Sequence, residues 1–539
     1  MSTYESTPSC PASDRSRQHI VLRSRKSALL VGLLAAFGAS ACHKADTAAR
    51  TVDPSSATPA ANGTGHISAT TNADSDVRAA VSSELRKDKK LDQAGINVGV
   101  EGGVVELTGK VDNLLSKARS TRIAESVRGV RSVSNRLEIS APPRPDRDMQ
   151  SDVAKALVYN AATAKLAIHV DVKDAVATLT GTVESWQERQ LAERIADGVR
   201  GIRLTQNALV TKYKAKRTDD AIAGDVKSRL QWDALVEHDP LEAKVTDSRV
   251  TLSGTVGSAA ERSRAITDAW VDGVDSVDFS GITVKWWDQP DKNLRPFVMK
   301  SDAEIAAAIK QAAFYDPRVF SFKINPSVTN GVATLTGTVP TLNAKMAAEA
   351  LARNTVGVTA VNDQLVARSE EPAADLYLQA RIREALNVDP LVESLEIFLT
   401  VKDGHVKFTG SVGTFLESAE ASDVASRLSG VTHVDNELAV REPAVPYVYS
   451  AYLDPYTPYV ETWYVIAARP FGTDADIADR IKTGFFWSPF VHSGDVHVSV
   501  ENGRATLTGT VESFRERQAA GNSALAAGAV SVDNELKVG

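Results

Sequence analysis

The chain has 539 residues, more than one domain usually holds, and 43% of them are hydrophobic, so folded cores are expected. It carries 61 Lys and Arg against 68 Asp and Glu, a formal net charge of −7. A surface of that sign does not collect phosphates, which excludes nucleic acid as a general partner. The two cysteines are Cys10 and Cys42, so no intramolecular disulfide framework can form beyond residue 42.

Residues 1–41 are predicted to be a lipoprotein signal peptide. Basic residues precede an apolar run over 28–37, and small residues then lead to Cys42. This layout is typical of a secretory signal, and the run is shorter than the ~20 residues of a membrane span. Residues 39–42 resemble a bacterial lipobox, which implies that Cys42 becomes the lipidated first residue, and His43 after it favours the outer membrane. The alternative is an ordinary cleaved signal, or an uncleaved anchor, in which Cys42 is incidental.

Residues 42–73 are predicted to form a disordered tether. The segment is rich in Ala, Thr, Ser, Asn, Gly and Pro and has few large apolar side chains. Such a composition cannot bury enough surface to offset the entropy lost on ordering. A flexible segment of this length reaches about 30 Å, which suits a link between a lipid anchor and a folded body.

Beyond the tether, a short string close to Leu-Thr-Gly-Thr-Val recurs six times. Its glycines, for which we expect a local backbone demand, are Gly109, Gly181, Gly254, Gly337, Gly410 and Gly509. They are separated by 72, 73, 83, 73 and 99 residues. A Val-x-Asn-x-Leu string follows in several copies, as at 133–137 and 532–536, whereas the third copy departs most from it. A nearly constant period indicates tandem copies of one domain, with linkers inserted at the two longer spacings.

Each copy is predicted to have the element order α-β-β-α-β. The residues 301–304 read as a helix-capping box, and Val496, Val498 and Val500 alternate as in a half-buried strand. Asn502-Gly503 supplies the positive φ of a tight hairpin. The buried stripe of a second helix is spaced i, i+3, i+4, i+7 at Ala192, Ile195, Ala196 and Val199. The fold class is therefore α+β, with two helices on a small three-stranded sheet in each copy.

These strings resemble the BON domain of osmotically inducible periplasmic proteins and outer-membrane lipoproteins. The resemblance covers residues 74–140, 148–213, 218–286, 301–368, 375–441 and 474–539. It implies an α-β-β-α-β fold in each copy, no catalytic centre and no cofactor. It also implies a role in binding phospholipid or other envelope surfaces during membrane maintenance or osmotic stress. The copies are expected to follow one another as a beaded chain, in which non-adjacent copies share few contacts.

The first copy offers a candidate site for anionic phospholipid. It is the copy nearest the expected anchor, and it is basic on and after its second helix. Each suitably placed cation beside an anionic membrane gains about 1 kcal/mol. The candidate contacts are Lys117, Arg119, Arg122 and Arg128. The alternative is a solvated helix face without a ligand.

The linker 444–473 is rich in tyrosine and proline and offers a candidate interface. Tyrosine and tryptophan suit surfaces that are half apolar and half wet, such as membrane headgroups and protein partners. The candidate residues are Tyr447, Tyr449, Tyr452, Tyr456, Tyr459, Trp463 and Tyr464. The alternative is a strap that packs across an open sheet face of the fifth or sixth copy.

No residue pattern indicates an enzyme. The nine histidines do not recur at equivalent positions, so no metal site is predicted, and Ser185 and Ser513 read as helix caps and not as nucleophiles. Two functions remain: a non-enzymatic envelope lipoprotein that binds phospholipid, and a periplasmic scaffold that binds protein or peptidoglycan partners without lipid selectivity. Both place the protein on the periplasmic side of the cell envelope, anchored to the outer membrane.

Overall fold

The computed structural model describes residues 73–236, 241–285, 300–319, 323–369, 374–441, 472–491, 494 and 496–538. The predicted signal peptide, Cys42 and the tether up to residue 72 lie outside these residues. The aromatic residues proposed for the 444–473 linker, from Tyr447 to Tyr464, also lie outside them.

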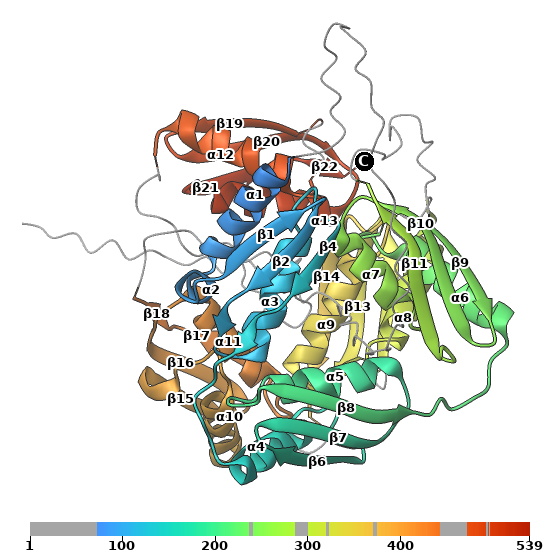
Figure 1. Ribbon diagram of the computed structural model, residues 1–539, viewed down its shortest axis with the longest axis vertical. Coiled ribbons are helices and arrows are strands. Elements are labelled where there is room, and N and C mark those ends of the chain that lie inside the picture. Colours follow the sequence, from blue (N-terminus) through green and yellow to red (C-terminus); the bar gives the residue numbers. More distant parts are fainter. Residues whose placement is uncertain are drawn as a thin grey trace, which may run out of the picture.

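Domain 2 shows the fold of one repeat. It runs α4 (Asp146–Tyr159), β6 (Ile168–Lys173), β7 (Val176–Val183), α5 (Trp186–Asp197) and β8 (Leu204–Thr211). The central strand β7 pairs antiparallel with β6 and parallel with β8, and both helices cover one face of this sheet (Figure 1). The core under the helices includes Ala192, Ala196 and Val199 of the expected stripe. The α+β class and the α-β-β-α-β order are confirmed.

The other five domains repeat this order, with the closing strand broken in domains 1, 5 and 6. Domain 1 consists of α1 (Asp74–Lys87), α2 (Lys89–Gln93), β1 (Asn97–Glu101), β2 (Val104–Thr108), β3 (Lys110–Val111), α3 (Leu114–Glu125), β4 (Ser132–Asn135) and β5 (Glu138–Ile139). Domain 3 consists of α6 (Asp219–Trp232), β9 (Leu241–Thr246), β10 (Arg249–Val256), α7 (Ala259–Ala269) and β11 (Ser276–Val284). Domain 4 consists of α8 (Asp302–Phe314), β12 (Lys323–Thr329), β13 (Val332–Val339), α9 (Leu342–Arg353) and β14 (Ala360–Ala367).

Domains 5 and 6 complete the chain. Domain 5 consists of α10 (Asp375–Val388), the 3-10 turn η2 (Ser394–Glu396), β15 (Ile397–Lys402), β16 (His405–Val412), α11 (Phe415–Ser426), β17 (His433–Asn436) and β18 (Ala439–Val440). Domain 6 consists of α12 (Asp474–Trp487), β19 (Val496–Glu501), β20 (Arg504–Val511), α13 (Phe514–Ala526), β21 (Ser531–Asn534) and β22 (Lys537–Val538).

An aspartate at the start of the first helix holds the hairpin turn in every domain. In domain 6, Asp474 accepts hydrogen bonds from the backbone N–H groups of Asn502 (2.8 Å) and Gly503 (2.7 Å). The equivalent aspartates are Asp74, Asp146, Asp219, Asp302 and Asp375. The turn needs such a clamp because Asn502 and Gly503 have φ of 52° and 76°, and a carboxylate satisfies both N–H groups at once.

The domains pair in nested order: 1 with 6, 2 with 5, and 3 with 4 (Figure 1). One hydrogen bond recurs in all three pairs. The N–H of the third residue after one domain's second helix donates to the carbonyl of the last residue in the partner's first helix. The bonds are Arg128 to Trp487 (2.8 Å), Arg200 to Val388 (2.7 Å) and Val356 to Trp232 (3.0 Å). Recurrence of one contact at equivalent positions shows that the three pairs dock in the same relation.

Within domains 1, 2 and 3, the second helices meet head to tail in a closed triangle. Leu115 at the start of α3 reaches Gly198 after α5, and Trp186 at the start of α5 stacks on Trp270 after α7, with ring centroids 5.1 Å apart. Ala259 at the start of α7 joins the core of domain 1 beside the end of α3.

Two contacts repeat this relation in domains 4, 5 and 6. Asn343 at the start of α9 donates to Asp423 near the end of α11 (3.3 Å). Arg353 at the end of α9 lies 5.3 Å from the centroid of the Phe514 ring at the start of α13. The pairs and triangles together have the connectivity of a D3 hexamer made from one chain. The expectation of a beaded chain is therefore wrong, because the second helices are buried between domains as well as against their own sheets.

Candidate binding sites at the domain pairs

Each domain pair encloses a hollow between its four helices. The hollow is about 500 Å³ in the pair of domains 1 and 6, about 100 Å³ in the pair 2 and 5, and about 30 Å³ in the pair 3 and 4. The first hollow is lined by α1, α3, α12 and α13, and the third by α6 to α9. The second is lined by α4, α5, α10 and α11, and also by Leu115 of domain 1 and by Arg318 and Asn343 of domain 4. The hollows occupy equivalent positions, so their differing volumes reflect the side chains that face across each pair.

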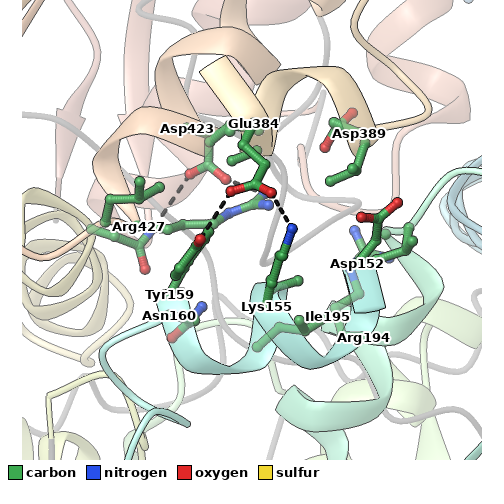
Figure 2. Close-up of a pocket in the computed structure, with 18 of the residues that line it drawn as sticks. Asp152, Lys155, Tyr159, Asn160, Arg194, Ile195, Glu384, Asp389, Asp423 and Arg427 are labelled. Atoms are coloured by element: carbon green, nitrogen blue, oxygen red, sulfur yellow. Dashed lines mark hydrogen bonds and ion pairs between the residues drawn. The ribbon is translucent and has the colours of Figure 1, made fainter. Parts of the chain in front are cut away.

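In the pair 2 and 5, first-helix side chains close over the cavity (Figure 2). Lys155 of α4 forms an ion pair with Glu384 of α10, and the Tyr159 hydroxyl donates to the same carboxylate at 2.9 Å. The hydrogen bond with Glu384 raises the pKa of Lys155, and the same bond lowers the pKa of Glu384. The bridge thus holds its charges at neutral pH, although an exposed pair of this kind contributes little to stability.

The deeper wall of this cavity is a cluster of buried charges. Arg427 forms ion pairs with Asp423 and with Glu420 (3.0 Å) on α11. Burial raises the pKa of Asp389 to about 6, and burial together with nearby Asp389 raises the pKa of Glu420 well above its usual range. Arg427 faces these three carboxylates, and the charges of Arg200 and Arg194 also act on Asp389 and Glu420 respectively.

The pair 3 and 4 is closed by side chains that cross it. Arg229 of α6 binds Asp268 of α7 at 2.6 Å and lies over the ring of Tyr315 in domain 4, 5.0 Å from its centroid. Arg264 forms an ion pair with Asp233, and both side chains are buried. Burial, followed by repulsion from Asp233, raises the pKa of Asp268 to about 6. This network fills the space that the other pairs leave open.

The four cations proposed for lipid contact do not form an exposed patch. Arg119 is 2% exposed and its Nε lies 2.6 Å from Asp88, which is equally buried; Arg122 is 5% exposed. Arg128 donates to the carbonyl of Ser488 in domain 6 (3.0 Å), and Lys117 donates to the carbonyl of Leu137 (2.7 Å). Helix α3 packs inside the body and these cations have partners within the protein, so the proposed lipid contact through all four of them stays a prediction.

The repeated glycines all lie in the left-handed half of the backbone map. Their φ values run from 112° at Gly410 to 135° at Gly181, and an added Cβ at Gly181 would lie 2.2 Å from the Ala167 carbonyl oxygen. Ser185 and Ser513 accept hydrogen bonds from the N–H groups of Glu188 and Glu516, so their predicted role as helix caps is confirmed.

The tenth residue of each first helix lies at the pair interface and is not among the predicted site residues. It is counted from the aspartate that starts the helix and holds the hairpin turn. In the pair 2 and 5 these residues are Lys155 and Glu384, and in the pair 3 and 4 they are Ser228 and Gln311, whose side chains hydrogen-bond at 2.6 Å. Aligning the six repeats on that aspartate would have shown opposite charges at this position in copies 2 and 5. The sequence held no signal that those two copies face each other.

Among the described residues, no group of three His, Cys, Asp or Glu side chains is placed to hold a metal ion. No helix in the described ranges is long and apolar enough to cross a bilayer. What the pair interfaces offer is hydrogen bonding, ion pairing and shape, which is the chemistry of a binding site.

Repeated units of two helices on a three-stranded sheet define the class of small tandem α+β domains. The sequence pattern of the BON domain matches residues 73–141, 145–213, 218–285, 301–369, 374–442 and 473–539. That is well over half of the chain, and the chain belongs to the BON domain family.

Two relatives share parts of this sequence. Osmotically-inducible protein Y of Escherichia coli is 33% identical over 139 residues, which is 24% of this chain and 69% of that protein. The outer membrane lipoprotein DolP of Haemophilus influenzae is 29% identical over 116 residues, 21% of this chain and 60% of that protein. Among solved structures, the C-terminal domain of CdsD, a structural protein of the type III secretion system of Chlamydia trachomatis, is 12% identical with a TM-score of 0.11, covering 39% of this chain and 98% of that domain.

Proposed function

We propose that this chain is a non-enzymatic protein of the bacterial cell envelope, anchored through lipidated Cys42 to the outer membrane. The supporting observation is its BON membership together with similarity to an outer membrane lipoprotein and an osmotically inducible protein. The tether 42–73 would join the anchor to α1, where the described body begins. In this position the six-domain body would bind envelope components during osmotic stress.

The test of the anchor is intact-mass spectrometry of protein extracted from membranes. We expect a diacyl or triacyl addition on Cys42 and loss of residues 1–41. The Cys42→Ala variant should then move from the membrane fraction to the soluble periplasmic fraction. An unmodified N-terminus at any other residue would contradict the anchor.

Between the two envelope functions, the burial of α3 supports a scaffold for protein or peptidoglycan partners over reading of anionic phospholipid by domain 1. Arg119 and Arg122 are buried and therefore not placed to meet headgroups. We expect protein without its lipid to stay in the supernatant when vesicles of anionic phospholipid are sedimented at low salt. Binding that weakens with salt, and weakens further in Lys117→Gln, would restore phospholipid as the ligand.

A further inference from the structure

The hollow between domains 1 and 6 has the dimensions of a ligand site. At about 500 Å³ it falls within the roughly 300–1,000 Å³ typical of small-molecule pockets, and its two counterparts fall well below that range. The three pairs share their fold and their recurring backbone hydrogen bond, but the first helices of this pair, α1 and α12, approach each other less closely than α4 and α10 or α6 and α8 do.

The tenth residues of the first helices explain the opening. Ser83 of α1 and Thr483 of α12 stand where Lys155 meets Glu384 in the pair 2 and 5. Both short side chains are exposed and line the hollow. A serine and a threonine cannot span a distance that a lysine and a glutamate bridge, so α1 and α12 leave a cleft between them.

The lining of this cleft is amphipathic and its charges balance. Ile123 of α3, Val127 in the turn after it and Ala519 of α13 give an apolar floor, and Trp487 and Phe490 add aromatic surface. Hydroxyl and amide groups come from both domains: Ser83, Thr483, Asn522 and Ser523.

Among the described residues of the lining, the four charged ones are two acids and two bases. Lys87 pairs with Glu84 at 2.6 Å, and Arg480 donates to the Ala527 carbonyl at 2.8 Å. Asp76 is the second acid. Balanced charges do not select an ionic ligand, since net attraction needs an excess of one sign.

We propose that the cleft between domains 1 and 6 binds a short neutral glycan of N-acetylated hexose units. A pyranose ring has an apolar C–H face that packs on an aromatic side chain, and hydroxyl and acetamido groups that exchange hydrogen bonds with Ser, Thr and Asn. The cleft supplies both surfaces, and the described residues that line it hold no surplus cation of the kind that an anionic headgroup would require. This proposal goes beyond the envelope location, and it holds or fails independently of the anchor at Cys42.

The test is isothermal titration calorimetry of the full mature chain with N,N′,N″-triacetylchitotriose, an uncharged trimer of N-acetylglucosamine. We expect saturable binding to one site. The double variant Ser83→Lys/Thr483→Glu, which copies the bridge of the pair 2 and 5, should bind at least tenfold more weakly. The matched control Ser228→Lys/Gln311→Glu places the same residues across the closed pair 3 and 4 and should leave binding unchanged.

Thermal unfolding establishes that each variant is folded. If the double variant is unfolded, Ser83→Gln provides a single substitution that narrows the same cleft and should also weaken binding. Absence of saturable binding by the parent overturns the proposal, as does equal binding by the parent and the cleft variants. Lysophosphatidylcholine serves as a competing probe. If it binds in the cleft and the trisaccharide does not, the site takes acyl chains and the glycan assignment is wrong.

Discussion

The pairs 3·4 and 1·6 are built from the same helices in the same relation, yet one is closed and the other is open. In the pair 3·4, Arg229 and Tyr315 reach across the interface, and a hollow of about 30 Å³ remains. In the pair 1·6, Ser83 and Thr483 face a cleft of about 500 Å³. The backbone contact that docks the domains is common to both, so docking and closure are separate properties of the interface.

This separation shows how a duplicated domain can diversify. The recurring hydrogen bond and the head-to-tail triangles fix where each domain sits, and they involve helix ends. The middle of the first helix takes no part in these docking contacts. An ion pair there can therefore be replaced by two hydroxyl side chains while the domains stay docked. A body of six copies can thus contain both rigid joints and a binding cleft.

The largest effect is expected from breaking the buried ion pairs of Arg264, which lie inside domain 3 beside its interface with domain 4. Replacing Arg264 with Gln leaves the buried carboxylates of Asp233 and Asp268 without their shared cation. Removing one partner of a buried ion pair costs about 3–5 kcal/mol in unfolding free energy. Urea denaturation followed by circular dichroism would measure it. Lys87→Gln at the open cleft is the control and should cost below about 0.5 kcal/mol; similar losses for both would mean that the pair 3·4 is no better closed than the pair 1·6.

The next effect concerns the repeated glycine at two positions, one with a close backbone neighbour and one with more space beside it. Gly181→Ala would suffer both its φ of 135° and a close approach to the Ala167 carbonyl, whereas at Gly109 the nearest atom lies 3.4 Å from the added Cβ. We expect a loss of about 1–2 kcal/mol for Gly109→Ala from backbone strain. Gly181→Ala should lose about 1–3 kcal/mol more from overpacking.

Hydrogen exchange resolved by peptide would show how far the Gly181→Ala damage spreads. Because domain 2 docks on domain 5, protection should fall in both domains before it falls elsewhere. Loss confined to domain 2 would indicate that the docking contacts contribute little to stability.

A pH-dependent effect is expected at the triangle contact beside the open pair. Burial raises the pKa of Glu125 to about 7, opposed by a hydrogen bond from Ser263 and by Arg262 and Arg122. The folded state therefore holds a proton that the unfolded chain, with a pKa near 4.5, releases. The contribution of Glu125 to the unfolding free energy is fully present below pH 4.5. It is lost as pH rises through about 7, which lowers the unfolding free energy by about 1–3 kcal/mol.

Glu125→Gln should remove this part of the slope. Its unfolding free energy measured between pH 5 and 8 should fall less than that of the parent. Parallel curves for the two proteins would show that Glu125 is already ionised in the folded state at pH 5.

The smallest effect is expected from opening the pair 2·5 to resemble the pair 1·6. Lys155→Ser/Glu384→Thr removes a bridge that is largely solvent-exposed, and such pairs contribute at most about 1 kcal/mol. We expect a shift of that size or less in urea, with domains 2 and 5 still docked by hydrogen exchange. Undocking of this pair would show that residue ten holds the domains together and does not merely fill the space between them.

The sequence by itself determined the repeated unit. The Leu-Thr-Gly-Thr-Val strings, the Asn-Gly turns, the capping boxes at Ser301 and Thr473 and the helical stripe at Ala192 and Ala196 are local patterns, because each depends on neighbours within a turn, a hairpin or one helix face. Such patterns predicted the α-β-β-α-β order and the family. An aspartate stands 28 residues before the turn in every copy, so the position of Asp474 recurs in the sequence. Its hydrogen bonds to the turn, however, depend on a contact that only folding creates.

Only the tertiary structure decided how the six units meet. The order of pairing depends on which surfaces fit when the chain folds back. Because the repeats have nearly the same sequence pattern, that pattern does not indicate which repeat pairs with which. For this reason the sequence alone does not distinguish a basic helix that faces lipid from one whose Arg119 pairs with a buried Asp88. The cleft at Ser83 and Thr483 was hidden for the same reason, since two small polar residues 400 positions apart become a site only when α1 and α12 are brought face to face.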